Sequence, residues 1–236
     1  MTRYYAEREF EIFNKQAEIL SSLAIYNPIV FDVGANEGQS IEKYHQLCTS
    51  ATIYSFEPNP LAWDKLQESY GHNSKVKLFK KGLNEQSGLC SFFVTRELSA
   101  SSLFQPEVKL QRLSKDRKYD FEEIKVDCIT LDKFSIMFGI DQIDILKIDV
   151  QGAELNVLKG ACNLLSRGSI SVIFLEITFA ETYVNQMQLI DLLSFIEQHN
   201  YKIWDLAPFV YTRTGRLWAA NAIILSRDAY NKIEST

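Results

Sequence analysis

Small residues follow the first apolar segment of the chain in a pattern suited to ligand binding. The apolar run Ile29–Val33 is followed by Gly34, Asn36 and Gly38, and a helical pattern begins directly afterwards. Glycine lets the backbone approach a ligand closely, and asparagine is one of the few other residues that tolerate a left-handed conformation. A turn of this kind between a strand and a helix favours a ligand site, although it is also typical of an ordinary tight turn.

An acidic residue ends the second apolar segment, where nucleoside-binding sheets use a carboxylate. Glu57 follows the run 52–56 and precedes Pro58 and Asn59. In such folds a carboxylate at this position accepts hydrogen bonds from the two ribose hydroxyls of a nucleoside. We therefore predict that Glu57, Pro58 and Asn59 line a nucleoside site together with the glycine turn.

The glycine spacing and Asp32 indicate which nucleoside is bound. Dinucleotide sites use G-x-G-x-x-G to accommodate a pyrophosphate, whereas this chain has G-x-x-x-G from Gly34 to Gly38. Asp32 would repel a pyrophosphate, but it could bind the amino group of a methionine moiety, directly or through water. The alternative is that Asp32 only accepts hydrogen bonds from the amides of its own turn.

Three further carboxylates lie near the predicted carboxyl ends of later strands. Asp149 ends the run 143–149, Glu154 begins the next helix, and Glu176 ends the strand 170–176. Ligands of open α/β sheets bind at this edge. A helix cap, a favourable helix-dipole charge and a surface position are the respective structural alternatives.

The elements that position these residues alternate along the chain. Strand patterns occur at 29–33, 52–56, 76–79, 143–149 and 170–176, with helical patterns such as 39–47 between them. Alternation of this kind predicts βαβ units and a parallel sheet. Strands at 201–206 and 217–225, joined by a turn at Gly215, break the alternation. We predict a doubly wound, mostly parallel α/β sheet of the Rossmann-like type with a C-terminal antiparallel hairpin.

Secondary features complete this prediction. Additional strands are expected at 89–95 and 124–129, an edge near Leu164, and helices at 131–138 and 186–198. The polar stretch 96–120 is expected to be a loop or lid. Helical spacing of apolar residues over 4–25 predicts a covering helix. The chain thus divides into a helical extension, 1–27, and one catalytic domain, 28–236.

Four motifs together resemble those of one enzyme family. They are VFDVGANEG at 30–38, FEPNP at 56–60, TLD at 130–132 and LKIDVQGAE at 146–154, with a small-residue segment at 99–103. In order and spacing they resemble the FkbM family of S-adenosylmethionine-dependent methyltransferases over residues 28–225. Gln151 stands where that family commonly has Glu. The resemblance implies a class I methyltransferase fold, S-adenosyl-L-methionine as cofactor, and methylation of a hydroxyl of a sugar, a glycan or another small secondary metabolite.

Methylation of a hydroxyl requires a group that takes up the proton. His45, His72 and His199 adjoin none of the motifs. The candidates are therefore Asp149, Glu154 and Glu176, either as direct bases or as ligands of a divalent cation such as magnesium. We favour a direct base.

Two other functions use the same features. A nicotinamide-dependent oxidoreductase shares the fold and the acidic residue, but the missing glycine pattern and the terminal hairpin disfavour it. A catalytically silent module that binds the nucleoside without turnover is the second alternative, because carboxylates in motifs do not prove a productive acceptor site.

Composition limits the partners and the compartment. The net charge is −5 without a block of Lys or Arg, which argues against nucleic acid as a substrate. The apolar runs are too short to span a bilayer, and the charged N-terminus does not resemble a signal peptide. Four widely spaced cysteines are typical of reduced thiols in a cytoplasmic protein. A small-molecule or glycosyl acceptor is the expected partner, and no feature specifies an oligomeric state.

Overall fold

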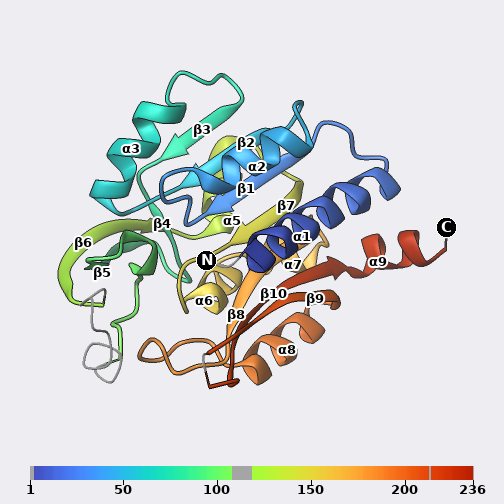
Figure 1. Ribbon diagram of the computed structural model, residues 1–236. Helices are drawn as coiled ribbons and strands as arrows, with labels where there is room; N and C mark the ends of the chain where they lie inside the picture. Colours follow the sequence, from blue (N-terminus) through green and yellow to red (C-terminus); the bar gives the residue numbers. More distant parts are fainter. Residues whose placement is uncertain (1–2, 108–118, 213, 236) are drawn as a thin grey trace.

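A seven-stranded sheet forms the centre of the protein, with helices on both of its faces (Figure 1). The computed structural model describes residues 3–107, 119–212 and 214–235. The strand order is β3-β2-β1-β7-β8-β10-β9. The strands are β1 (Ile29–Val33), β2 (Thr52–Phe56), β3 (Val76–Phe79), β7 (Ile143–Ile148), β8 (Ile170–Thr178), β9 (Tyr201–Tyr211) and β10 (Leu217–Ser226).

The pairing of the strands confirms the predicted topology. β3, β2, β1, β7 and β8 pair in parallel, whereas β10 is antiparallel to both β8 and β9. β1 lies between β2 and β7, so the chain runs outward from β1 in both directions. The carboxyl ends of β1 and β7 therefore meet at the switch point of the sheet, where ligands of such folds bind.

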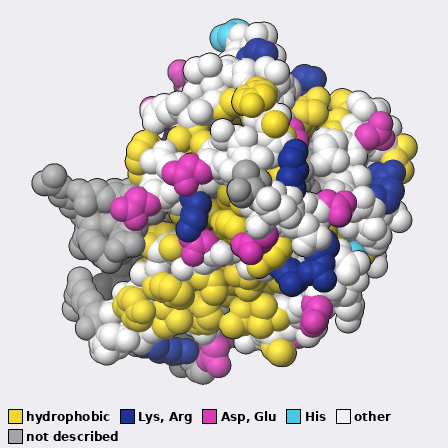
Figure 2. All heavy atoms as spheres, turned by 90° about the vertical axis from the view of Figure 1, so that its right-hand side faces the viewer, with side chains coloured by type: hydrophobic (Ala, Val, Ile, Leu, Met, Phe, Trp, Pro, Cys, Tyr) yellow, Lys and Arg dark blue, Asp and Glu magenta, His cyan; other side chains and the backbone are white. Residues whose placement is uncertain are grey.

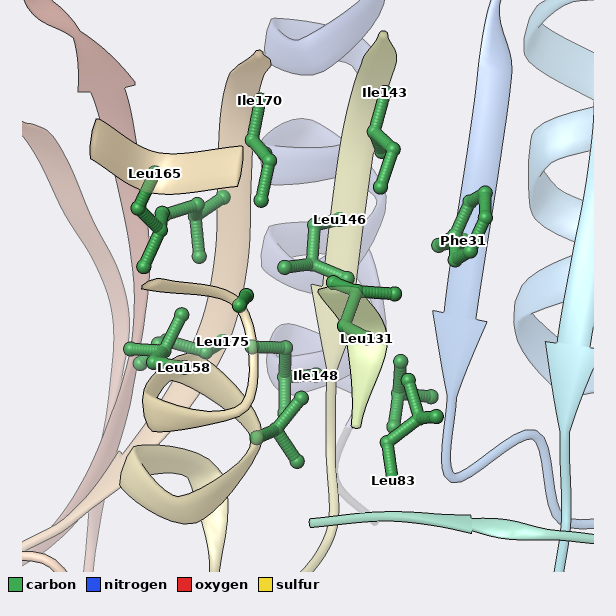
Figure 3. Close-up of a cluster of buried hydrophobic side chains, with 14 of the residues drawn as sticks. Phe31, Leu83, Leu131, Ile143, Leu146, Ile148, Leu158, Leu165, Ile170 and Leu175 are labelled. Carbon is green, nitrogen blue, oxygen red and sulfur yellow. The ribbon is translucent and has the colours of Figure 1, made fainter. Parts of the chain in front are cut away.

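Alternating residues of the strands build one core on each face. Phe31, Leu146 and Ile148 pack with the helices α5 to α8, and Figure 3 shows the contributions of α5, α6 and α7. Val30 and Ile145 pack with α1, α2, α3 and α9. The helices are α1 (Arg3–Ser22), α2 (Gln39–Leu47), α3 (Pro60–Tyr70), α5 (Leu131–Phe138), α6 (Glu154–Lys159), α7 (Cys162–Ser166), α8 (Leu189–Gln198) and α9 (Arg227–Glu234). Because central parallel strands are covered on both faces, β7 is buried along its whole length.

A small second sheet covers the carboxyl edge of the first. It has the order β4-β6-β5, formed by β4 (Gly82–Leu83), β5 (Gly88–Thr95) and β6 (Phe121–Ile129). After β5 the chain forms the short helix η1 (Leu98–Ala100) and pairs back on β5 through Phe93 and Ser102. The first part of the predicted loop is therefore ordered against the sheet, while 108–118 lie outside the described residues.

Two predicted elements differ from the structure, and one helix was not predicted. The edge expected near Leu164 is the helix α7, whose Leu164 and Leu165 face the core. The helix expected from Gln186 begins at Leu189, because the Gln186 side chain accepts hydrogen bonds from the Thr182 and Tyr183 N–H groups and so stabilises a turn. The helix α9 was not predicted, since its sequence is polar apart from a few residues.

The predicted N-terminal helix packs directly on the sheet. Phe13 of α1 makes an edge contact with Phe174 of β8, at a ring-centroid distance of 5.3 Å, and Ile12 and Ile19 are buried with it.

The face in Figure 2 carries acidic and basic side chains mixed together, with hydrophobic side chains gathered across its lower half. Within the described residues, no helix is long and apolar enough to cross a bilayer.

Candidate active site

The turn after β1 has the backbone conformation that its sequence predicts. Gly34, Asn36 and Gly38 have φ values of +80°, +47° and +99°. A Cβ atom on Gly34 would lie 1.9 Å from the carbonyl oxygen of Asp149, so the absence of a side chain lets the ends of β1 and β7 meet. A Cβ on Gly38 would instead meet the ring of Tyr70 at 2.2 Å. Gly38 therefore serves packing between α2 and α3.

Glu57 holds two loops together at the end of β2. Its Oε2 accepts a hydrogen bond from the Asn36 N–H at 2.8 Å, and its Oε1 accepts one from the Asn59 N–H at 2.7 Å. Burial raises the pKa of Glu57 to about 7, although both hydrogen bonds and the charge of Lys147 lower it. Each carboxylate oxygen keeps a second lone pair for another donor.

Asn59 begins the next helix. Its Oδ1 accepts a hydrogen bond from the Leu61 N–H, 3.1 Å away, and so caps α3, while its amide donates to Ser101 Oγ at 3.3 Å. This second bond ties the start of α3 to the small-residue segment after β5. Asn59 thus links the end of β2 to both of these segments.

A buried lysine lies at the meeting point of β1 and β7. Lys147 Nζ is 3.0 Å from Asp32 Oδ1, 3.1 Å from the carbonyl oxygen of Gly34 and 3.9 Å from Asp149 Oδ2. Burial alone would lower the pKa of Lys147, but the charges of Asp32, Asp149 and Glu57 raise it above its usual value. The site therefore contains an ammonium group between carboxylates.

Sequence reasoning missed Lys147, although a signal was present. A lysine between Leu146 and Ile148 interrupts an apolar run in a strand with no solvent-facing side. A charge in such a strand must find partners within the protein. The partners that the structure shows for Lys147 are two carboxylates of the motifs, Asp32 and Asp149.

The loop after β7 presents Asp149 to solvent and turns Glu154 inward. The Asp149 side chain is 44% exposed, and its Oδ1 accepts a hydrogen bond of 2.7 Å from the amide of Gln151. Glu154 is 3% exposed, and its Oε1 accepts hydrogen bonds from the N–H groups of Val150 and Gly152. Burial raises the pKa of Glu154 to about 7, against those bonds. Glu154 stabilises the loop that carries Asp149.

A cavity of about 200 Å³ lies over the carboxyl ends of β1, β2 and β7. Of the residues predicted to bind the cofactor, those that line it are Gly34, Asn36, Glu57, Pro58 and Asp149, and those that do not are Asp32, Gly38 and Asn59. Asp32 is completely buried beneath Lys147. A direct role of Asp32, Gly38 and Asn59 in cofactor binding stays a prediction. Residues of the 99–103 segment form the opposite wall.

A second cavity of about 80 Å³ adjoins the first. It shares Ser40, Lys147 and Asp149 with the larger cavity, and its other wall includes Glu176 of β8 and Asn221 of β10. Asp149 and Glu176 are thus brought together around one space, whereas Glu154 lines neither cavity.

The larger cavity fits a nucleoside with free ribose hydroxyls. Glu57 faces it with lone pairs to spare, and the buried Oδ1 of Asn36 has no hydrogen-bond partner among the described residues. Two hydroxyl donors would satisfy groups of this kind. In the part of the chain that the structure describes, no three His, Cys, Asp or Glu side chains gather so that they could hold a metal ion.

Comparison with known proteins identifies the family. The model of the methyltransferase FkbM domain matches residues 32–203. The chain belongs to the FkbM methyltransferase family. It is a methyltransferase with S-adenosylmethionine as its cofactor, as its motifs predicted. The oxidoreductase alternative is therefore wrong.

The chain is similar to two named methyltransferases in sequence and to one solved structure in fold. The chain is 29% identical over 192 residues to the 2-O-methyltransferase NoeI of Sinorhizobium fredii, which covers 76% of each protein. It is 26% identical over 151 residues to the hexuronic acid methyltransferase AglP of Haloferax volcanii, covering 63% of this chain and 55% of AglP. The solved structure of WbdD is similar in fold, with a TM-score of 0.51, 12% identity and coverage of 93% of this chain and 40% of that one.

Proposed function

We propose that this FkbM-family enzyme transfers a methyl group to a hydroxyl oxygen of a sugar, a glycan or another small secondary metabolite. One observation carries the proposal: Asp149 lies on the walls of both cavities. A side chain in that position can contact a hydroxyl in the smaller cavity while the cofactor lies in the larger one. The acceptor oxygen and the reactive methyl group then meet beside a carboxylate.

The chemistry requires alignment and the removal of one proton. Glu57 and Asn36 line the cavity that would hold S-adenosylmethionine, which would supply an electrophilic methyl group on a sulfonium with a neutral thioether as leaving group. Asp149 accepts the hydroxyl proton as the new carbon–oxygen bond forms. Gln151 donates a hydrogen bond from its side-chain amide to the Asp149 carboxylate, and the Lys147 ammonium lies 3.9 Å from it, so both hold the carboxylate in place.

The other two predicted catalytic carboxylates have different surroundings. Glu154 is occupied by backbone N–H groups and lines neither cavity, so we assign it to positioning the loop. Glu176 lines the smaller cavity but not the larger one. The ammonium of Lys147 favours Asp149 as a direct base over Asp149 as a metal ligand, because a positive group 3.9 Å away disfavours a divalent cation on the same carboxylate.

The names of two relatives support an oxygen atom and a sugar as the acceptor. NoeI is named as a 2-O-methyltransferase and AglP as a hexuronic acid methyltransferase. Hydroxyl groups of sugars are only weakly acidic and keep their proton at neutral pH, which is consistent with a carboxylate base beside the reacting atoms.

Asp149→Asn tests the proposal. The amide keeps the size of the side chain but cannot take up a proton, so turnover should fall about 10²-fold or more, with cofactor affinity within a few-fold. The exposed Glu68→Gln on α3 is the control. Methyl transfer from labelled cofactor is measured with and without a chelator, which should not change the rate. Near-native turnover in Asp149→Asn excludes Asp149 as the base. If the wild type binds the cofactor but transfers its methyl group to no hydroxyl acceptor, the result supports a silent binding module.

A further inference from the structure

The smaller cavity is built from both ends of the chain. Every residue that lines the larger cavity lies between 33 and 151, inside the segment 32–203 that the family model matches. The smaller cavity adds Phe13 from α1 and Asn221 from β10, both outside that segment. Members of a family share a cofactor but differ in acceptor. The smaller cavity therefore has the composition expected of the acceptor site.

Two polar side chains lie side by side on the sheet where it lines this cavity. Asn221 and Glu176 are direct partners in the antiparallel pairing of β10 and β8. Side chains of such a pair lie on the same face, with Cβ atoms about 4.5–5.5 Å apart. A carboxylate accepts two hydrogen bonds from neighbouring hydroxyls, while an amide both donates and accepts. Phe13 and Phe174 supply an apolar wall beside them.

The charges around the cavity limit what can bind. Asp149 and Glu176 both line the cavity. The cation that lines it with them, Lys147, is already paired with the buried Asp32, so the remaining negative charge repels an anionic group. A protonated amine would be attracted, but it has no lone pair with which to attack a methyl group. A neutral edge bearing two adjacent hydroxyls can donate one hydrogen bond to each of the two carboxylates.

We propose that the cavity binds a vicinal diol of a pyranose. Asp149 faces the hydroxyl that is methylated, while Glu176 and Asn221 hold the neighbouring hydroxyl. Glu176 and Asn221 are thus specificity-determining residues. This assignment rests on the proposed methyl transfer to oxygen and adds to it the acceptor class and the residues that select it.

The test uses neutral methyl pyranosides as probes, each paired with a monodeoxy analogue that lacks one hydroxyl of the diol. Binding to the complex of the protein with S-adenosylhomocysteine is followed by saturation-transfer NMR, and methyl transfer by mass spectrometry. At least one pyranoside should bind and be methylated, and its deoxy analogue should bind tenfold or more weakly. Asn221→Ala and Glu176→Gln should each weaken the pyranoside tenfold or more and leave cofactor affinity unchanged. Glu68→Gln is the matched control.

The outcomes separate this inference from the proposed function. Pyranosides that bind in a way that depends on Glu176 and Asn221, but are never methylated, support the subsite and refute the proposed transfer to a hydroxyl. Methylation of a hydroxyl acceptor with the same efficiency in Asn221→Ala and Glu176→Gln overturns the subsite and keeps the proposed function. Cofactor binding with no pyranoside bound also overturns the subsite. Melting temperatures near that of the wild type confirm that the variants are folded.

Discussion

The titration of Glu57 predicts how cofactor affinity depends on pH. Two backbone N–H groups already donate to its carboxylate, so two ribose hydroxyls can be accepted only by the ionised form. Its pKa of about 7 leaves nearly all of the free protein competent at pH 8 and about one tenth competent at pH 6. Affinity for S-adenosylhomocysteine, measured by calorimetry, should therefore fall about tenfold between pH 8 and pH 6.

Two variants assign this slope to its residue. Glu57→Gln should bind the cofactor weakly and remove the slope, whereas Glu154→Gln should retain it, although the pKa of Glu154 is also about 7. The folding stability of the free protein should change in the opposite direction. Because the folded-state pKa of Glu57 is raised, the folded state holds its proton longer, and the free energy of unfolding falls as pH rises from about 4.5 to 7. Equal affinity at pH 6 and pH 8 in the wild type would refute the reasoning.

Three further predictions concern stability. Lys147→Met should lower the free energy of unfolding in urea by about 3–5 kcal/mol, because it leaves Asp32 buried without its cation. Adding Asp32→Asn should recover part of the loss. If the double variant recovers nothing, lost packing and not the lost ion pair explains the destabilisation. Asn59→Ala should cost about 1 kcal/mol through loss of the α3 cap and should also weaken cofactor binding, whereas the cap variant Ser226→Ala on α9 should affect stability alone. Gly38→Ala should destabilise more than Gly139→Ala, since both have positive φ but only Gly38 meets a neighbour, Tyr70; equal losses in thermal unfolding would contradict the packing role.

The sequence predicted the sheet well because its signals are local. Apolar runs that alternate with segments of helical spacing specify each βαβ unit. The terminal hairpin is recognised because its two strand patterns follow each other without a helical pattern between them. The turn at Gly34 and the acid at Glu57 were found because backbone conformation and position at a strand end are read directly from neighbouring residues.

The parts that sequence did not predict depend on contacts between distant segments. Glu154 was grouped with Asp149 because both follow β7, but the loop turns one outward and the other inward. Phe13 and Asn221 meet at one cavity although they come from opposite ends of the chain, and nothing local marks them. Gln151 looked like the loss of a charge, yet its amide is what donates a hydrogen bond to Asp149.

The position of β10 between β8 and β9 has a consequence for synthesis of the protein. β9 leaves the ribosome before β10 but pairs in this sheet with β10 alone, so β9 cannot join the sheet until β10 has emerged. During that interval β8, a buried apolar strand in the finished protein, has an open edge of unpaired N–H and C=O groups. Open apolar edges template pairing with other chains. A chain synthesised only as far as β9 therefore presents this edge of β8 to other chains, and slow translation of 201–226 would prolong that exposure.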